Sequence, residues 1–105
     1  MKNIILAFAT WLTIPIVNIA QPYKLRVIDS LLFQGEYQTV VNECNTQLKV
    51  DSLNPELYYK MGVAYQNLMI FDKSASALIK STKLSPENFK YNFSLGKYYH
   101  STGIS

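Results

Sequence analysis

The side chains that could carry out catalysis or bind a metal ion are few in this sequence. His100 is the only histidine and Cys44 is the only cysteine. A zinc site needs about four nitrogen, sulfur or oxygen ligands, and His100 has no Cys or His neighbour in the sequence. The chain also contains no Gly-x-Ser-x-Gly nucleophile turn, Gly-rich phosphate loop or dinucleotide-binding motif. We therefore expect no enzyme, no cofactor and no metal site.

The single cysteine excludes an internal disulfide bond. Cys44 falls in the interior of a predicted helix, a setting that does not activate a thiol. We expect it to pack as a small apolar side chain. The alternative is a redox role or a disulfide between two molecules.

The acidic residues are dispersed along the chain, and several lie near predicted helix starts or turns. There the helix dipole and helix capping explain them. We expect them at solvated positions, where they cannot form a general acid/base pair. They are Asp29, Glu36, Glu43, Asp51, Glu56, Asp72 and Glu87.

The net charge is small and evenly spread. It is +3 for the whole chain and falls to +2 when Lys2 is set aside. Lysine and arginine residues are scattered from Lys24 to Lys97 with acids among them and form no basic run. Nucleic-acid binding requires clustered positive charge, so no nucleic-acid partner is expected.

The N-terminus has the pattern of an export signal over residues 1–20. A cationic start at Lys2 precedes an apolar stretch over residues 4–19, and the small residue Ala20 precedes Gln21. The alternative is an uncleaved membrane anchor, but the stretch is shorter than the roughly 20 apolar residues that span a bilayer and contains polar residues. We expect an exported protein, periplasmic or associated with the outer envelope of a bacterium, with secretion possible and membrane contact only if the signal is retained.

The remainder of the chain repeats with a period of 34 residues. Shifting the sequence by this amount aligns Gly62 with Gly96, and apolar residues align at many other places. The aligned apolar sets are Val27/Met61/Leu95, Leu31/Tyr65/Tyr99, Tyr37/Phe71, Cys44/Leu78 and Val50/Leu84. Such agreement indicates one structural unit used more than once.

Each unit has the apolar spacing of two helices. Tyr58, Met61, Tyr65 and Leu68 recur at intervals of three or four residues, which places them on one helix face. This helix begins at residues 54–56, where Asn-Pro-Glu supplies a cap, a first-turn proline and an acid. We predict antiparallel helix pairs at 22–34 with 37–50 and at 55–68 with 71–84, followed by a helix at 88–102.

These residues resemble the tetratricopeptide repeat (TPR) family. The middle unit matches its motif best, and the third unit matches at Asn92, Leu95, Gly96, Tyr99 and Gly103. The first unit departs from it, with Ile28 in place of a glycine and Ser52 in place of the closing proline. The resemblance implies an all-α fold of antiparallel helix pairs stacked as a short right-handed TPR-type solenoid, with repeats at about 21–54, 55–88 and, partially, 89–105. The matching residues of the middle unit are Tyr58, Met61, Gly62, Tyr65, Phe71, Leu78, Ser81, Leu84 and Pro86.

Glycine at the repeated position allows two helices to approach closely. We expect Gly62 to lie against the small residue Ser74, whereas Gly96 has no second helix after it to lie against. About three units are usually needed for a stable stack, and the last helix carries Phe93, Leu95 and two tyrosines. We therefore expect the chain to be the front part of a longer solenoid, or to associate with itself through the last helix.

The resemblance also implies a site. TPR proteins usually bind extended peptides or helices in the concave groove formed by their first helices. The positions that correspond to this groove suit a peptide rather than a terminal carboxylate, because aromatic and aliphatic residues occupy several places where the family's carboxylate clamp has Lys, Arg or Asn. The groove candidates are Tyr59, Val63, Gln66, Asn67, Phe93, Lys97 and His100, preceded in the first unit by Leu25, Asp29 and Phe33.

The sequence therefore predicts an exported scaffold that binds a peptide or protein partner. One alternative is an extracytoplasmic input domain of a larger signalling protein. The other is a structural repeat protein that associates with itself.

Overall fold

The computed structural model describes residues 24–101, which contain helices joined by short turns and no strand. The first helix occupies residues 24–34. It is followed by α2 (Tyr37–Leu48), α3 (Pro55–Asn67), α4 (Phe71–Leu84) and α5 (Phe89–Ser101). The predicted all-α fold is confirmed, and the helix bounds differ from the predicted ones by at most two residues where the structure describes them. The predicted signal at 1–20 lies outside the described residues.

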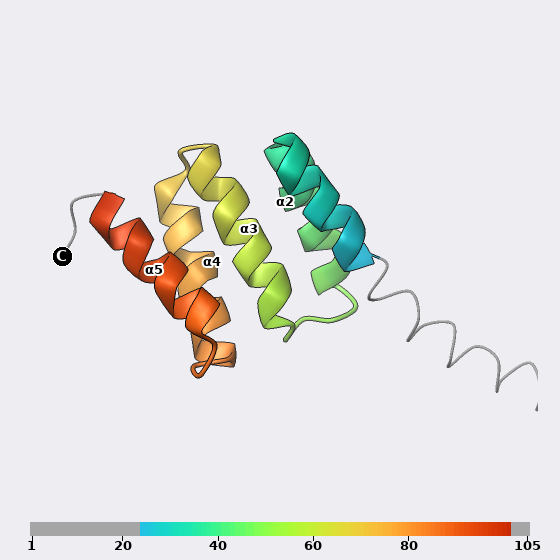
Figure 1. The fold of residues 1–105 in the computed structure, drawn as a ribbon. Coiled ribbons are helices and arrows are strands. Elements are labelled where there is room, and N and C mark those ends of the chain that lie inside the picture. Colours follow the sequence, from blue (N-terminus) through green and yellow to red (C-terminus); the bar gives the residue numbers. More distant parts are fainter. Residues whose placement is uncertain (1–23, 102–105) are drawn as a thin grey trace, which may run out of the picture.

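The helices form two layers (Figure 1). The first helix, α3 and α5 lie side by side in the front layer, and α2 and α4 lie behind them. The first helix is followed by α2 and α3 is followed by α4, and each rear helix runs back along its front helix, which is the arrangement of a TPR-type solenoid. None of the helices within residues 24–101 combines the length and the apolar content needed to cross a membrane.

The helix ends are determined by local sequence. The side chain of Asn54 accepts a hydrogen bond from the backbone nitrogen of Glu56 at 3.0 Å, and Pro55 occupies the first turn of α3. At the start of α5, the side chain of Asn88 accepts a bond from the backbone nitrogen of Tyr91 at 3.3 Å. These two caps begin the two front helices between which the site described below lies.

The core lies between the front and rear layers. Its fully buried members come from the first four helices, and the fifth helix adds the buried tyrosines Tyr91 and Tyr98. The hydroxyl of Tyr98 donates a 2.8 Å hydrogen bond to the carbonyl oxygen of Phe71, which joins α5 to the start of α4. The core members of the first four helices include Ile28, Val40, Val41, Cys44, Leu57, Ala64, Ala77 and Leu78.

The repeated glycine position is occupied differently in the two complete pairs. In the second pair, Gly62 accepts a hydrogen bond from its predicted neighbour Ser74, but the residue that lies against its open side is Leu78, which was not predicted. In the first pair, Ile28 takes the place of the glycine and Cys44 that of the leucine, and both are buried. A large residue on the front helix is thus matched by a small one on the rear helix, and the reverse holds in the next pair.

Candidate functional site

A groove of about 480 Å³ lies between α3 and α5. We call it the front groove. Tyr59, Val63, Gln66 and Asn67 form its α3 wall, and Ser94 and Lys97 form its α5 wall. Met69, in the turn after α3, and Phe71, at the start of α4, complete the lining. The lining residues lie toward the end of α3 that leads into α4.

Five of the ten residues predicted from the sequence to face a groove are brought together here. Tyr59, Val63, Gln66, Asn67 and Lys97 all line the front groove, because spacings of three and four residues keep the α3 members on one face. Met69, Phe71 and Ser94 were not predicted. The sequence signal that could have found the first two is that both are apolar and flank the predicted boundary between the two helices of the middle unit.

The other five predicted residues, two on α5 and three in the first unit, are not among those that line the front groove. Phe93 is 58% exposed and its ring stacks on that of Phe89, with centroids 6.0 Å apart. His100 is exposed near the end of α5. In the first unit, Phe33 is exposed, Leu25 packs against the core, and Asp29 forms an ion pair.

Half of the residues that line the front groove are polar, namely Gln66, Asn67, Ser94 and Lys97. Lys97 is its only charged lining residue. The side-chain amide of Asn67 donates a 2.9 Å hydrogen bond to the carbonyl oxygen of Val63, which leaves its own oxygen as an acceptor. The rest of the lining is mainly aromatic and aliphatic, so the groove offers apolar contact with a small number of hydrogen-bonding groups.

Tyr59 is held in place from the side of α5. The ammonium group of Lys90 lies 4.8 Å from the centroid of the Tyr59 ring, and the ring of Tyr91 lies at 5.2 Å. Cation–π and tilted aromatic contacts of this kind favour one ring orientation. The Tyr59 wall of the groove is therefore pre-organised.

Met69 has a left-handed backbone, with a φ of 62°. The turn closes with hydrogen bonds from Met69 N to Gln66 O and from Ile70 N to Tyr65 O, at 3.0 and 2.9 Å. This is the Schellman pattern, in which glycine normally occupies the left-handed position. A non-glycine residue costs about 1 kcal/mol there, and Met69 is 73% exposed, so its burial within the chain offsets little of that cost.

The same turn occurs 34 residues earlier, with glycine at the equivalent position. Gly35 has a φ of 80° and donates to Leu32 O at 3.1 Å, and Glu36 N donates to Leu31 O at 2.9 Å. The turn geometry is thus repeated although the residue type is not. The 34-residue shift places Met69 at the position of Gly35, but methionine gives no signal of a left-handed backbone, so this turn was not predicted.

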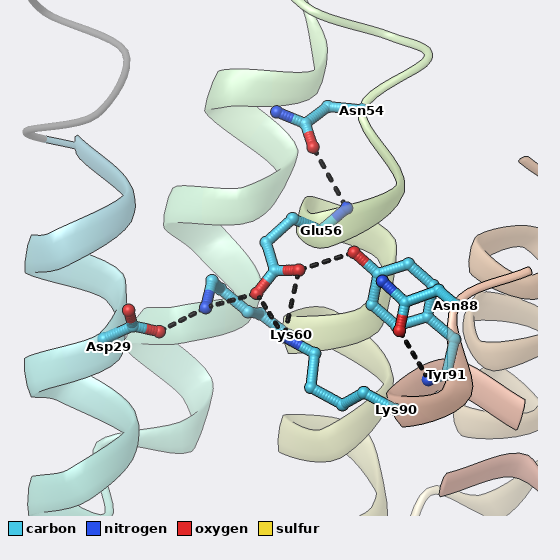
Figure 2. Close-up of polar contacts among 7 residues, drawn as sticks. All are labelled: Asp29, Asn54, Glu56, Lys60, Asn88, Lys90 and Tyr91. Carbon is cyan, nitrogen blue, oxygen red and sulfur yellow. Dashed lines mark hydrogen bonds and ion pairs between the residues drawn. The ribbon is translucent and has the colours of Figure 1, made fainter. Parts of the chain in front are cut away.

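A network of ion pairs crosses the front layer beside the groove (Figure 2). Lys60 of α3 is paired with Asp29 of the first helix and, at 2.9 Å, with Glu56 one turn earlier on α3. Glu56 also receives hydrogen bonds from α5, at 3.0 Å from Lys90 and at 2.5 Å from the hydroxyl of Tyr91. Three successive front helices are connected in this way.

The network changes the acid–base properties of its members. Burial alone would raise the pKa of Glu56, but hydrogen bonds from Tyr91, Lys60 and Lys90 outweigh it and lower this pKa to about 2. Burial opposes protonation of Lys60, yet its bonds to Asp29 and Glu56 raise its pKa. Burial and the bond to Glu56 raise the pKa of the Tyr91 hydroxyl. The expectation of a solvated Glu56 is therefore wrong, and the group is held as a carboxylate.

No residue cluster suited to a metal ion occurs in the described part of the chain, where groups of three or more His, Cys, Asp or Glu side chains are absent. Cys44 has no exposed surface, and burial raises the pKa of its thiol to about 12. A second hollow of about 280 Å³ lies between α3 and α4, lined by Tyr58, Met61, Tyr65, Lys73, Ser76, Ala77 and Lys80. Its lysines lie 5.9 Å from tyrosine ring centroids.

No protein-family model matches the chain, and no curated protein matches it. Among solved structures, the chain is similar to "MamA 41-end" from Desulfovibrio magneticus RS-1, with a TM-score of 0.73 and 23% identity. The match covers 77% of this chain and 46% of that one, so the chain spans about half the length of that structure. The similarity concerns the fold, which in that protein is a TPR-type all-α solenoid.

Proposed function

We propose that this chain is a protein-interaction module that binds an extended peptide segment of a partner protein in the front groove. The observation that carries the proposal is the groove itself. It is open, mainly apolar, and about 480 Å³ in volume. Aromatic walls with a few hydrogen-bonding groups suit side-chain anchors of a peptide.

The arrangement of the walls favours a segment rather than a small compact ligand. The groove runs between two parallel helices and is bounded by side chains from α3, α5 and the α3–α4 turn. Peptide main-chain groups could bond to Gln66 and Asn67 on α3 and to Ser94 on α5. Because rigid helices supply these groups, the protein loses little conformational entropy when a peptide binds.

The test is a selection of random 12-residue peptides, displayed on phage, against the full chain. Val63→Trp places a bulky ring in the groove, and Ser76→Trp places the same ring in the hollow between α3 and α4, away from the groove. Circular dichroism first establishes that both variants keep the wild-type helix content.

Peptides that bind in the groove are expected to bind the wild type and Ser76→Trp alike and to lose about tenfold or more in affinity for Val63→Trp, as expected for loss of one buried anchor. Failure to enrich any peptide, or equal binding to both variants, would count against the proposal.

Self-association through α5 is a second candidate. Phe89 and Phe93 are 80% and 58% exposed and stack on each other, and a Cβ atom on Gly96 would meet nothing within 4 Å. An exposed apolar cluster of this kind is typical of a contact surface. Sedimentation equilibrium of the wild type and of Phe89→Ser/Phe93→Ser tests it: a dimer that dissociates in the double variant supports it, and a monomeric wild type contradicts it.

We further propose that the protein acts after export, in the periplasm or at the outer envelope of a bacterium. The support is the signal pattern at residues 1–20. Expression of the full chain in a bacterium, followed by intact-mass measurement of the periplasmic fraction, tests this. A product beginning at Gln21 supports cleavage after Ala20, whereas full-length product in the cytoplasm contradicts export.

A further inference from the structure

The left-handed residue Met69 is the starting point. Two turns of the same geometry, 34 residues apart, have glycine at one place and methionine at the other. Glycine adopts this backbone without strain, so methionine makes the second turn less favourable. Packing of the Met69 side chain within the described chain offsets little of this strain, because Met69 is 73% exposed.

What distinguishes Met69 from Gly35 is its place beside the groove. The methionine side chain lines the front groove next to Phe71, which is 37% exposed, and opposite the α5 wall. Methionine is flexible and polarisable, and it adapts its shape to apolar side chains of different outline. An exposed apolar pair at this end of the groove is therefore suited to contact an apolar side chain of a ligand.

The charges at the groove have one sign. Lys97 is the only charged lining residue, and Lys90, two turns earlier on α5, is paired with Glu56 and does not line the groove. The nearest carboxylate on α3, Glu56, is already engaged by Lys60, Lys90 and Tyr91. A ligand with a carboxylate near Lys97 would complement this charge, and a ligand with a cation there would be repelled.

From these observations we infer that the front groove selects a peptide segment that presents a bulky apolar side chain to Met69 and Phe71 and a carboxylate to Lys97. Met69 is then a specificity-determining residue whose strained backbone is offset by contact with the ligand. This inference rests on the proposed function, since it names the class of peptide that the same groove accepts.

The experiment uses peptides enriched from the random 12-residue library, together with variants of the full chain. The enriched peptides are expected to contain Asp or Glu and a bulky apolar residue. Lys97→Glu is expected to weaken their binding about tenfold, as for loss of one charge-assisted contact. Synthetic peptides with lysine in place of the acid are expected to bind Lys97→Glu more tightly than they bind the wild type.

Three substitutions of Met69 distinguish the contribution of its side chain to peptide binding from the effect of its backbone strain on stability. Met69→Gly is expected to raise the melting temperature by about 4 °C or more while weakening peptide binding about tenfold. Met69→Asn keeps a residue that tolerates the left-handed backbone but removes the apolar side chain, and it should also lose binding. Met69→Leu retains an apolar side chain and is expected to retain binding.

Gly35→Met is the matched control, because a Cβ on Gly35 would meet only Tyr37, at 3.9 Å. It should lower the melting temperature without changing peptide binding. If Met69→Gly and Met69→Asn bind as the wild type does, or if enriched peptides lack acids and bind Lys97→Glu unchanged, the inference is wrong although the proposed function stands. If no peptide distinguishes the wild type from Val63→Trp, both fail.

Discussion

The hydroxyl of Ser74 donates a 2.8 Å hydrogen bond to the carbonyl oxygen of Gly62 and so joins α4 to α3. Beside this bond, a Cβ atom on Gly62 would lie 2.7 Å from Cδ2 of Leu78 and 3.3 Å from its backbone nitrogen. Leu78 has no exposed surface and little room to move. At the equivalent place in α5, a Cβ on Gly96 would meet nothing within 4 Å.

Alanine at these two glycines is therefore expected to have opposite effects. Gly62→Ala forces Leu78 to shift, and this overpacking exceeds the gain in helix propensity, so the free energy of unfolding should fall by about 1–2 kcal/mol. Gly96→Ala gains helix propensity without a clash and should raise it by about 0.5–1 kcal/mol. Urea denaturation followed by circular dichroism measures both. Equal effects of the two substitutions would show that the contact between position 62 and Leu78 does not affect the free energy of unfolding.

The two lysines bound to Glu56 are expected to differ in their contributions to stability. The Lys60 side chain is 6% exposed and lies between two carboxylates, whereas that of Lys90 is 50% exposed. Lys60→Met leaves both carboxylates without this cation and should cost about 2–3 kcal/mol, because Glu56 retains other donors. Lys90→Met removes an exposed pair and should cost less than about 1 kcal/mol. A loss from Lys60→Met no greater than that from Lys90→Met would contradict a stabilising role for the buried lysine.

The low pKa of Glu56 predicts a loss of stability in acid. This pKa is about 2 in the folded chain, against an ordinary value of 4.5, so the folded state favours the carboxylate. The resulting stabilisation is complete above pH 4.5 and is lost as the pH falls toward 2, and it amounts to about 3 kcal/mol. Melting temperatures recorded from pH 6 to pH 2 should fall less steeply for Glu56→Gln than for the wild type.

Glu87→Gln serves as the control for that titration, because it removes one negative charge from an exposed residue outside the network. It should keep the wild-type slope. If Glu56→Gln also keeps the wild-type slope, the three hydrogen bonds to Glu56 do not contribute to acid stability.

Cys44 is expected to be unreactive in the folded chain. The thiol has no exposed surface, and burial raises its pKa to about 12, so almost no thiolate is present at neutral pH. Ellman's reagent should label it only as fast as the chain opens, and at once in 6 M guanidinium chloride. Rapid labelling of the folded protein would instead support the redox alternative.

The fold could be predicted from the sequence because its signals are periodic. The apolar spacing of α3 and the 34-residue alignment depend on many residues, so one exception, such as Ile28 in place of glycine, does not hide them. Helical phase also placed Tyr59, Val63 and Gln66 on one wall of the groove. The same reasoning from helical phase wrongly placed Phe93 in the groove, because its ring stacks on that of Phe89 one turn earlier.

The remaining features depend on side-chain and backbone conformations that residue type does not specify. Methionine gives no indication of a left-handed φ, so the strained backbone of Met69 beside the groove was not predicted. The ion network joins Asp29, Lys60 and Glu56 across two helices, and it was not predicted. The only part of it that the sequence could indicate is the Glu56–Lys60 pair, whose members are four residues apart on one helix. Long-range pairs of this kind require the packing of the helices to be known.

Glu56 and Lys90 occupy the same place in successive repeats, 34 residues apart, and their side chains meet at 3.0 Å. In an array of identical repeats, each of these residues would face a copy of itself, and like charges would repel across the seam. The opposite charges of Glu56 and Lys90 therefore favour the placement of α5 beside α3 that is found here, and they oppose a stack in which two copies of α3 lie side by side. The difference between the two repeats at this position therefore helps to determine which helices become neighbours.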